Sequence, residues 1–161
     1  CLVGSEMCIR DRGIYVLLIL ATQENQGAVK SQTLSEKLEV SDSSLKKILR
    51  KLVVANLITS NASKDGGFQL NQSIEDITLK DVIEAISNGD VIEFEISHLS
   101  RRIFFNDQHI KDSEIKVKQQ LNDAIQAFNE KLDELSLVEL LEDEYFKHKL
   151  VDWNDNHRTE Q

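Results

Sequence analysis

The sequence predicts a mainly helical fold with one small β-hairpin. Two amphipathic helical segments are separated by only three residues, 39–41, so the chain must turn sharply between them. Two short strand-forming segments follow directly, with a glycine pair between them. An apolar stripe at three- and four-residue intervals then runs along residues 113–135. This order predicts a winged helix-turn-helix domain followed by a long C-terminal dimerisation helix.

The first predicted helix spans residues 13–23 and lies in the core, because few polar residues interrupt its apolar surface. Its inward side is formed by Ile14, Leu17, Leu18 and Ala21. Residues 1–12 show no clean periodicity and resemble a translated sequencing adapter. We therefore expect a non-native leader there and assign it no function.

Capping patterns mark the two helices of the helix-turn-helix. Thr33 and Glu36 have the spacing of a capping box and predict a short helix through Leu38. Ser41 is a favourable N-cap for a second helix over residues 42–55. Four apolar residues form one face of this second helix: Leu45, Ile48, Leu49 and Leu52. Hydroxyl and cationic residues form the other: Ser43, Ser44, Lys46, Lys47, Arg50 and Lys51.

The two strand candidates cover residues 57–60 and 68–70. Gly66 and Gly67 lie between them and are expected to supply the positive backbone φ angles that a turn needs. We therefore predict a hairpin, the wing, over residues 57–70.

Two further capping boxes, at Thr78 and Ser136, open an amphipathic helix that ends near residues 88–89 and a short closing helix. The tail from Asp152 onward is polar and expected to fray. Three aromatic residues near the end are expected to pack back on the arm: Tyr145, Phe146 and Trp153. The predicted organisation is a leader at 1–12, a winged helix-turn-helix DNA-binding domain at 13–88, a sensor or linker segment at 89–112, the dimerisation helix and closing helix at 113–150 and a flexible tail at 151–161.

Charge is distributed unevenly along the chain. The net charge of -9 argues against a nucleic-acid contact, but residues 28–72 carry seven cations and four anions, whereas residues 111–161 carry seven cations and thirteen anions. A basic segment in front of an acidic one favours a local nucleic-acid surface. The longest apolar run, residues 14–21, is too short to span a bilayer, so we expect a cytoplasmic, nucleoid-associated bacterial protein.

The helix over residues 42–55 fits a recognition helix. Short hydroxyls and a lysine near its N-terminus, Ser43, Ser44 and Lys47, are candidate base readers, and the cations further along are candidate phosphate contacts. An ordinary amphipathic helix with a solvated cationic face is the alternative for this segment taken alone. The predicted DNA-binding residues are Thr33, Ser41, Ser43, Ser44, Lys46, Lys47, Arg50, Lys51, Lys64, Gly66 and Gly67.

Four stretches carry a more specific resemblance: TLSEKLEVSDSSLKKILRKLVVANLI at 33–58, GGFQL at 66–70, ITLKDVIEAI at 77–86 and SLVEL at 136–140. In this order they resemble the winged-helix transcription factors that include the iron-sulfur cluster regulator, the nitric-oxide-sensing repressor and the cysteine-metabolism repressor. The likeness covers about residues 15–141. It implies a homodimer whose recognition helices and wings hold a pseudo-palindromic operator, with the segment before the long helix acting as the sensor.

The sequence departs from this family in the sensor and in the wing. Cluster-binding members carry three cysteines in the sensor, whereas residues 89–118 contain none. We therefore expect a cysteine-less member of the family, apart from the assumed leader, without a cluster and without any other cofactor. The wing has Lys64 as its one cation, with Gln69 and Gln72 where the family has basic residues, so weaker phosphate binding is expected. His98 and His109 lack a metal-ligand spacing, and no metal ligand is assigned.

We therefore expect a DNA-binding transcriptional regulator, a homodimeric repressor, rather than an enzyme, because no catalytic motif is visible. Its expected partners are duplex DNA and a second copy of the chain, with no membrane. Five residues are expected at the dimer seam: Val117, Leu121, Ile125, Phe128 and Leu132. Two alternatives stay open. The chain is instead a winged-helix module that holds protein, or its apolar segment over residues 91–105 lines a pocket for an unidentified small molecule rather than joining the wing domain to the arm.

Overall fold

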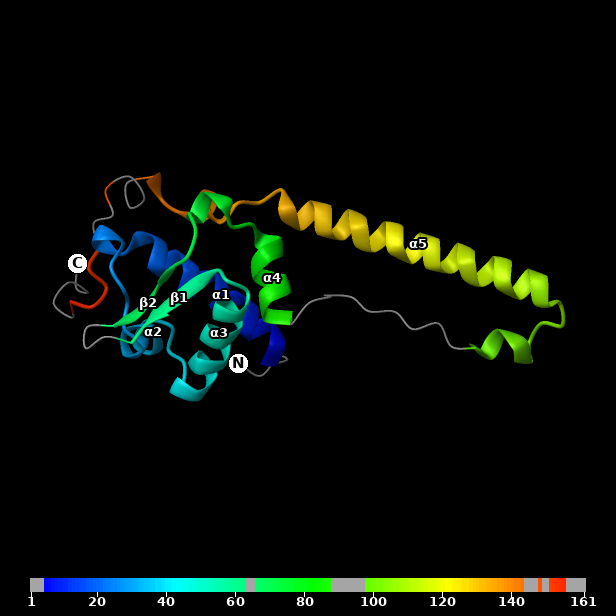
Figure 1. Cartoon of the computed structure of the whole chain (residues 1–161), viewed down its shortest axis with the longest axis horizontal. Helices are drawn as coiled ribbons and strands as arrows, with labels where there is room; N and C mark the ends of the chain where they lie inside the picture. The colour runs from blue at the N-terminus through cyan, green and yellow to red at the C-terminus, as the bar shows by residue number, and fades with distance from the viewer. Residues whose placement is uncertain (1–4, 63–65, 88–97, 144–147, 149–150, 156–161) are drawn as a thin grey trace.

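The structure is a computed structural model that describes residues 5–62, 66–87, 98–143, 148 and 151–155; for residues 5–10 and 98 it describes the backbone alone. Helices α1 (Ser5–Thr22), α2 (Ser31–Lys37), α3 (Asp42–Val54) and α4 (Leu79–Ser87) form one lobe with a hairpin of strands β1 (Ile58–Asn61) and β2 (Gly67–Leu70). Helix α5 (Asp107–Asp133) extends from this lobe as a long arm (Figure 1). The predicted fold class, mainly helical with one hairpin, is confirmed.

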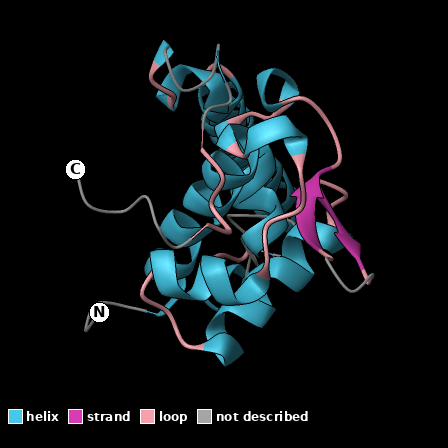
Figure 2. Cartoon of the chain, turned by 90° about the vertical axis from the view of Figure 1, so that its left-hand side faces the viewer, coloured by secondary structure: helices cyan, strands magenta, loops and turns pink. Residues whose placement is uncertain are grey.

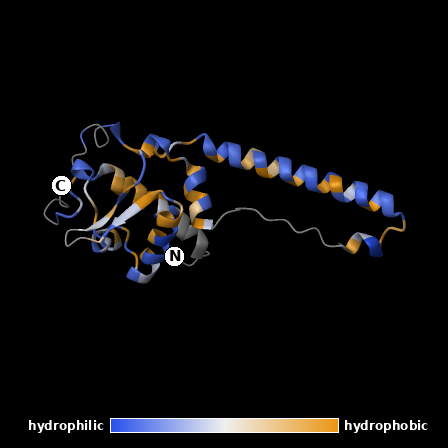
Figure 3. Cartoon of the chain, viewed as in Figure 1, coloured by the Kyte–Doolittle hydropathy of each residue, from blue (hydrophilic) through white to orange (hydrophobic). Residues whose placement is uncertain are grey.

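Helix α1 (Ser5–Thr22) contacts α3, α4 and β2 and buries Val16, Leu17 and Leu20 among them. Its predicted start at residue 13 is wrong, because the helical backbone continues through part of the expected leader. Gly13 allows α1 to approach α4 closely: a Cβ there would lie 2.5 Å from Ile86 Cδ1. The apolar interior of the lobe contrasts with the mostly hydrophilic surface of the arm (Figure 3).

Helices α2 (Ser31–Lys37) and α3 (Asp42–Val54) form the helix-turn-helix, labelled near the hairpin in Figure 1. Figure 2 shows the hairpin at one side of the helices. Glu39 has φ 50° in the turn between them, a left-handed conformation. The Ser35 hydroxyl lies 2.9 Å from the Val40 carbonyl and 2.9 Å from the Asp42 carboxylate, and its single proton can be donated to either acceptor. This contact links α2 to the turn and to the start of α3. The apolar face predicted for α3 is confirmed, because its four leucine and isoleucine side chains are all buried.

The predicted capping box at Thr33 is wrong. Helix α2 begins at Ser31, two residues before Thr33, and its N-cap Lys30 has no side-chain oxygen to offer. Thr33 is buried inside the helix. The side chain of Asn154, far along the chain, instead accepts a hydrogen bond from the Lys30 backbone N–H at 3.0 Å. The start of α2 therefore depends on a tertiary contact rather than on a local cap.

Strands β1 (Ile58–Asn61) and β2 (Gly67–Leu70) pair antiparallel, with Ile58 opposite Leu70. Val29 pairs with Phe68 on the other side of β2 through two backbone hydrogen bonds of 2.8 Å. The expectation of a positive φ is wrong for Gly67, whose φ lies outside that region; a Cβ there would instead collide with the Val29 carbonyl. Glycine is needed at this position for close backbone approach.

Helix α4 (Leu79–Ser87) begins with the predicted capping box, in which the Thr78 backbone N–H donates to Asp81 at 2.8 Å. The base of the arm is joined to α4, because the Leu79 N–H donates to the Leu135 carbonyl at 2.9 Å. The second predicted capping box, at Ser136, opens the short 3-10 helix Leu137–Leu140. The end of α4 predicted near residues 88–89 lies outside the described residues.

Helix α5 (Asp107–Asp133) starts six residues before the predicted position. Its N-cap is Asn106, whose side chain accepts from the backbone N–H groups of Gln108 and His109 at 3.0 and 3.1 Å. Residues 107–112 of the expected sensor segment are therefore part of the arm. A 3-10 helix, His98–Arg102, precedes α5 and packs on it, and Ile110 is buried there.

The expectation of a frayed tail is wrong for residues 151–155. The Val151 carbonyl accepts from the Glu24 N–H at 2.8 Å, and the Trp153 N–H donates to the Gln23 side chain at 2.9 Å. Trp153 packs against α1 and not on the arm: its indole N–H donates to the Thr22 hydroxyl at 3.0 Å. Tyr145 and Phe146 lie outside the described residues. This C-terminal segment closes the corner where α1 meets α2.

Candidate nucleic-acid interface

The N-terminus of α3 presents a cluster of three serine hydroxyls. Ser41 is the N-cap, and its side chain accepts from the Ser44 backbone N–H at 3.4 Å. The Ser41 hydroxyl also donates to the Ser44 hydroxyl at 3.0 Å and lies 3.2 Å from that of Ser43. Ser43 is exposed, whereas Ser44 is half-buried. The cap that starts the helix therefore also orders the polar groups at its exposed tip.

Three cations follow the serine cluster along the outer face of α3. Lys46, Lys47 and Arg50 are all exposed, and none forms an ion pair or a side-chain hydrogen bond with any residue that the structure describes. Their charges are therefore available for an external anion. The opposite, apolar face of α3 is buried, which fixes the rotation of the helix about its axis and holds these side chains outward.

Lys51 lies differently from the other predicted contacts. Its side chain is half-buried, and its ammonium group donates to the backbone carbonyl of Ile86, in the last turn of α4. A cation at a helix C-terminus satisfies a carbonyl that has no partner within the helix and interacts favourably with the helix dipole. Lys51 thus holds α3 against α4. Its position among other cations in the sequence had indicated a DNA contact instead.

The remaining predicted DNA-binding residues are divided between the core, the wing and the undescribed part of the chain. Thr33 is buried, and its hydroxyl lies 3.4 Å from Asn154 Oδ1. Gly66 precedes β2 and Gly67 is its first residue, paired with Asn61 at the turn end of the hairpin. Lys64 lies outside the described residues. The surface that the structure assembles is therefore the tip and outer face of α3, flanked by the hairpin.

The predicted dimer seam lies along the arm. Val117 is 50% exposed and Phe128 37% exposed, whereas Leu121, Ile125 and Leu132 are half-buried. In Figure 3 the arm is mostly hydrophilic, with separate hydrophobic bands along its length. Ile110 is the one residue of α5 that is buried within the described part of the chain. The arm therefore presents apolar side chains that the lobe of the same chain does not cover.

Metal and membrane sites do not emerge from the described residues. No group of three histidine, cysteine, aspartate or glutamate side chains among them could hold a metal ion. His109 lies edge-on to Phe104, with ring centroids 5.4 Å apart. Within the same part of the chain, no helix combines the length and the apolar character that a bilayer span requires.

A buried helix-turn-helix scaffold, an outward cationic face on its second helix and an adjacent hairpin define a winged helix-turn-helix protein. Residues 10–143 match the Rrf2 family, described as "Iron-dependent Transcriptional regulator", and the chain belongs to this family. The family consists of transcriptional regulators and not of enzymes, as the sequence predicts. The chain itself is cysteine-poor rather than cysteine-free, since it contains Cys1 and Cys8.

Two curated relatives are named as HTH-type transcriptional regulators. YffB of Lactococcus lactis is 43% identical over 76 residues, which cover 47% of this chain and 49% of the relative. YwgB of Bacillus subtilis is 35% identical over 99 residues, which cover 62% of this chain and 63% of the relative. The matches thus span about half and somewhat under two thirds of these relatives' lengths.

Solved structures share the fold. CymR, the global cysteine regulator of B. subtilis, superposes with a TM-score of 0.57 at 19% identity, covering 87% of this chain and 95% of CymR. IscR of T. potens gives a TM-score of 0.58 at 20% identity, covering 89% of this chain and 88% of IscR. The family resemblance inferred from the sequence is confirmed by the family match. At 19% and 20% identity, the solved structures show a shared fold and nothing further.

Proposed function

We propose that this chain is a DNA-binding transcriptional regulator that inserts α3 into a major groove and places its wing beside the adjacent backbone. The observation that carries the proposal is the outer face of α3, where three exposed cations without partners among the described residues follow a serine cluster ordered by the N-cap. Phosphate contacts position such a helix, and base edges are read near its N-terminus. Working on DNA, the protein would be cytoplasmic and nucleoid-associated.

The individual roles follow from exposure and partners. Ser43 and Lys47 are proposed to read bases, with Ser44 beside them, and Lys46 and Arg50 to contact phosphates. The sequence candidates whose side chains are hydrogen-bonded within the protein are proposed to act indirectly, by holding α3 in place: Thr33, Ser41 and Lys51. Lys64, Gly66 and Gly67 are proposed to contribute to the contact between the wing and DNA.

We further propose that two chains associate through the apolar face of α5 and bind a pseudo-palindromic operator as a repressor. The support is the set of apolar side chains on the arm that no described part of the chain covers. Such a stripe on a long helix is stabilised by burial against a partner helix. The symmetry of a dimer then requires the two α3 helices to be separated by about one turn of duplex, roughly 34 Å.

A second candidate function is a winged-helix module that binds protein. The net charge of -9 and the single wing cation favour it, because both weaken attraction to phosphates. The exposed cationic face of α3 favours DNA. Binding measurements decide between the two.

The test is fluorescence anisotropy of the full chain against a pool of random duplexes at several salt concentrations. We expect selection of a defined site and a linear fall of log affinity with log salt. Replacement of Lys46 by glutamine should lower the slope by about one. Lys116→Gln is the matched control, because Lys116 is an exposed lysine on the arm. Absence of affinity for every duplex at low salt would overturn the proposal.

A further inference from the structure

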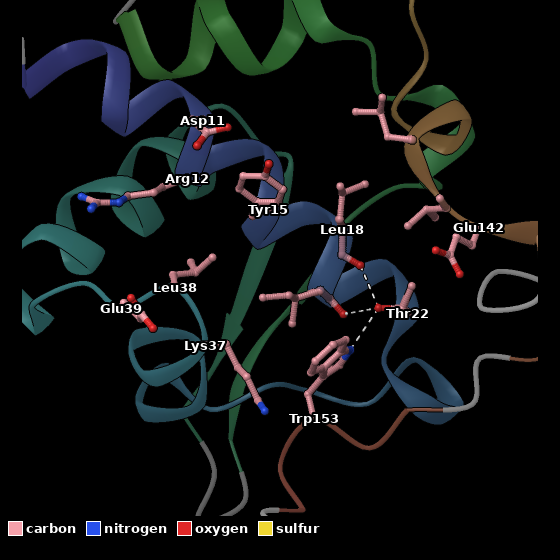
Figure 4. Close-up of a pocket in the computed structure, with 13 residues that line it drawn as sticks. Asp11, Arg12, Tyr15, Leu18, Thr22, Lys37, Leu38, Glu39, Glu142 and Trp153 are labelled. Carbon is pink, nitrogen blue, oxygen red and sulfur yellow. Dashed lines mark hydrogen bonds between the residues drawn. The ribbon is translucent and has the colours of Figure 1, made fainter. Parts of the chain in front are cut away.

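An open groove lies on the side of the lobe formed by the outer face of α1, the end of α2 and the C-terminal segment (Figure 4). Its volume is about 730 Å³. Sites for small organic ligands have volumes of roughly 300–1,000 Å³. The groove is separate from the serine cluster and the cations on the outer face of α3, none of which lines it.

Apolar and aromatic side chains form the walls of the groove. Tyr15 is 49% exposed and is flanked by Leu18, with Leu38 and Trp153 across the groove in Figure 4. Leu18, Leu38 and Trp153 are half-buried, so the apolar surface lies within the groove, as in small-molecule sites. The Tyr15 hydroxyl has no hydrogen-bond partner among the described residues.

Trp153 is held rigidly as one wall. Its indole N–H donates to the Thr22 hydroxyl at 3.0 Å, and its backbone N–H donates to Gln23 Oε1 at 2.9 Å. The Gln23 side chain in turn donates to Asp152 Oδ1 at 3.0 Å. The polar edge of the indole is thereby used within the protein, so its apolar ring is available as a preorganised surface. Preorganisation lowers the entropic cost of binding.

The cations and the carboxylates that line the groove differ in their exposure to solvent. Lys37 and Arg12 are half-buried, and neither forms an ion pair with a described residue. The Lys37 ammonium group lies 5.7 Å from the centroid of the Trp153 ring. The three carboxylates of the lining are exposed, and water screens them more strongly: Asp11, Glu39 and Glu142. Beside the Trp153 wall, the unpaired Lys37 ammonium group therefore offers a local position for a negative group.

We propose that the groove binds a small aromatic carboxylate, with its ring on the apolar walls and its carboxylate at Lys37, beside Trp153. An apolar lining with few polar groups that fix orientation is typical of small-molecule sites. A cation beside an aromatic ring provides a charge-assisted contact for the carboxylate at the edge of the apolar surface.

The groove is joined directly to the helix-turn-helix. Lys37 ends α2, and Leu38 and Glu39 form the turn before α3, with Glu39 in the left-handed conformation. An occupied groove would favour one arrangement of this turn and so shift the orientation of α3. This regulatory step rests on the proposed DNA-binding function, whereas ligand binding itself does not.

The test uses Trp153, the one tryptophan in the sequence, as the reporter. The full chain is titrated with phenylacetate and with its neutral analogue phenylacetamide while tryptophan emission is followed. We expect a saturable change with phenylacetate and roughly tenfold weaker binding of the amide, because one charge-assisted contact is lost. Lys37→Met should weaken phenylacetate binding by a similar factor, whereas Lys116→Met, on the arm, should leave it unchanged.

Three results would overturn the proposal: no saturable change, equal affinities for the acid and the amide, or unchanged binding in Lys37→Met. A tryptophan emission that changes with protein concentration but not with phenylacetate would also overturn the proposal. It would indicate that a second copy of the chain, rather than a small molecule, covers the groove. Because no DNA is present, failure here leaves the DNA-binding proposal standing. In a separate titration, phenylacetate should alter the affinity for the selected duplex in the parent and not in Lys37→Met.

Discussion

Replacement of Asn154 by alanine is expected to destabilise the lobe, because this residue joins the C-terminal segment to the start of α2. Its Oδ1 accepts from the Lys30 N–H at 3.0 Å, and its Nδ2 donates to the Ala28 carbonyl at 2.9 Å. The contact to the Thr33 hydroxyl, at 3.4 Å, is weaker. Each well-formed hydrogen bond contributes roughly 0.5–1.5 kcal/mol net, so Asn154→Ala should lower the free energy of unfolding by about 1–3 kcal/mol.

The assay is urea unfolding followed by circular dichroism, with the midpoint and slope fitted together. Asn154→Asp keeps the acceptor and loses the amide donor, so it should lose less than the alanine variant. Asn122→Ala is the matched control, because Asn122 is exposed on α5, and its stability should change by less than about 0.5 kcal/mol. If Asn154→Ala is as stable as the parent, the C-terminal segment does not hold α2 and this reasoning is wrong.

Four further predictions follow from the same structure. Arg50→Ala should weaken binding to all duplexes alike and lower the salt slope by about one, whereas Lys47→Ala should change sequence preference at a cost of roughly 1–3 kcal/mol; binding-site selection with each variant separates the two effects. Leu121→Asp should yield monomers or unfolded chains in sedimentation, and a stable dimer would contradict the proposed seam. Gly67→Ala should cost about 1–3 kcal/mol in urea unfolding, because its Cβ collides with the carbonyl of Val29, and an unchanged midpoint would show that the backbone adjusts freely. Protein purified anaerobically should contain no stoichiometric iron or acid-labile sulfide, and a visible charge-transfer band would refute the expected absence of a cluster.

The elements that could be predicted from the sequence are those whose signals are local. Ser41, Thr78 and Ser136 each start a helix where their capping patterns indicate, because a cap and its backbone partner lie within three residues of each other. The buried face of α3 follows from helical periodicity alone, and that face fixes the outward direction of Lys46 and Arg50. The fold class and the candidate interface could therefore be predicted from the sequence alone.

One missed boundary also had a local signal. Helix α5 begins after Asn106, a favourable N-cap residue directly followed by Asp107, yet the apolar stripe further along drew the predicted start to residue 113. Apolar periodicity does not mark this start, because the first turns of α5 contain few apolar residues. The side chain of Asn106 caps two backbone N–H groups there.

Tertiary structure alone decided the roles that depend on residues far apart in the chain. Thr33 has the pattern of a cap, but the oxygen that serves the start of α2 comes from Asn154, more than a hundred residues away. Lys51 belongs to a cationic run, but its ammonium group meets a carbonyl of α4. Sequence periodicity states which face of a helix is polar, and only the packing of other elements determines which polar groups on that face remain free for a ligand.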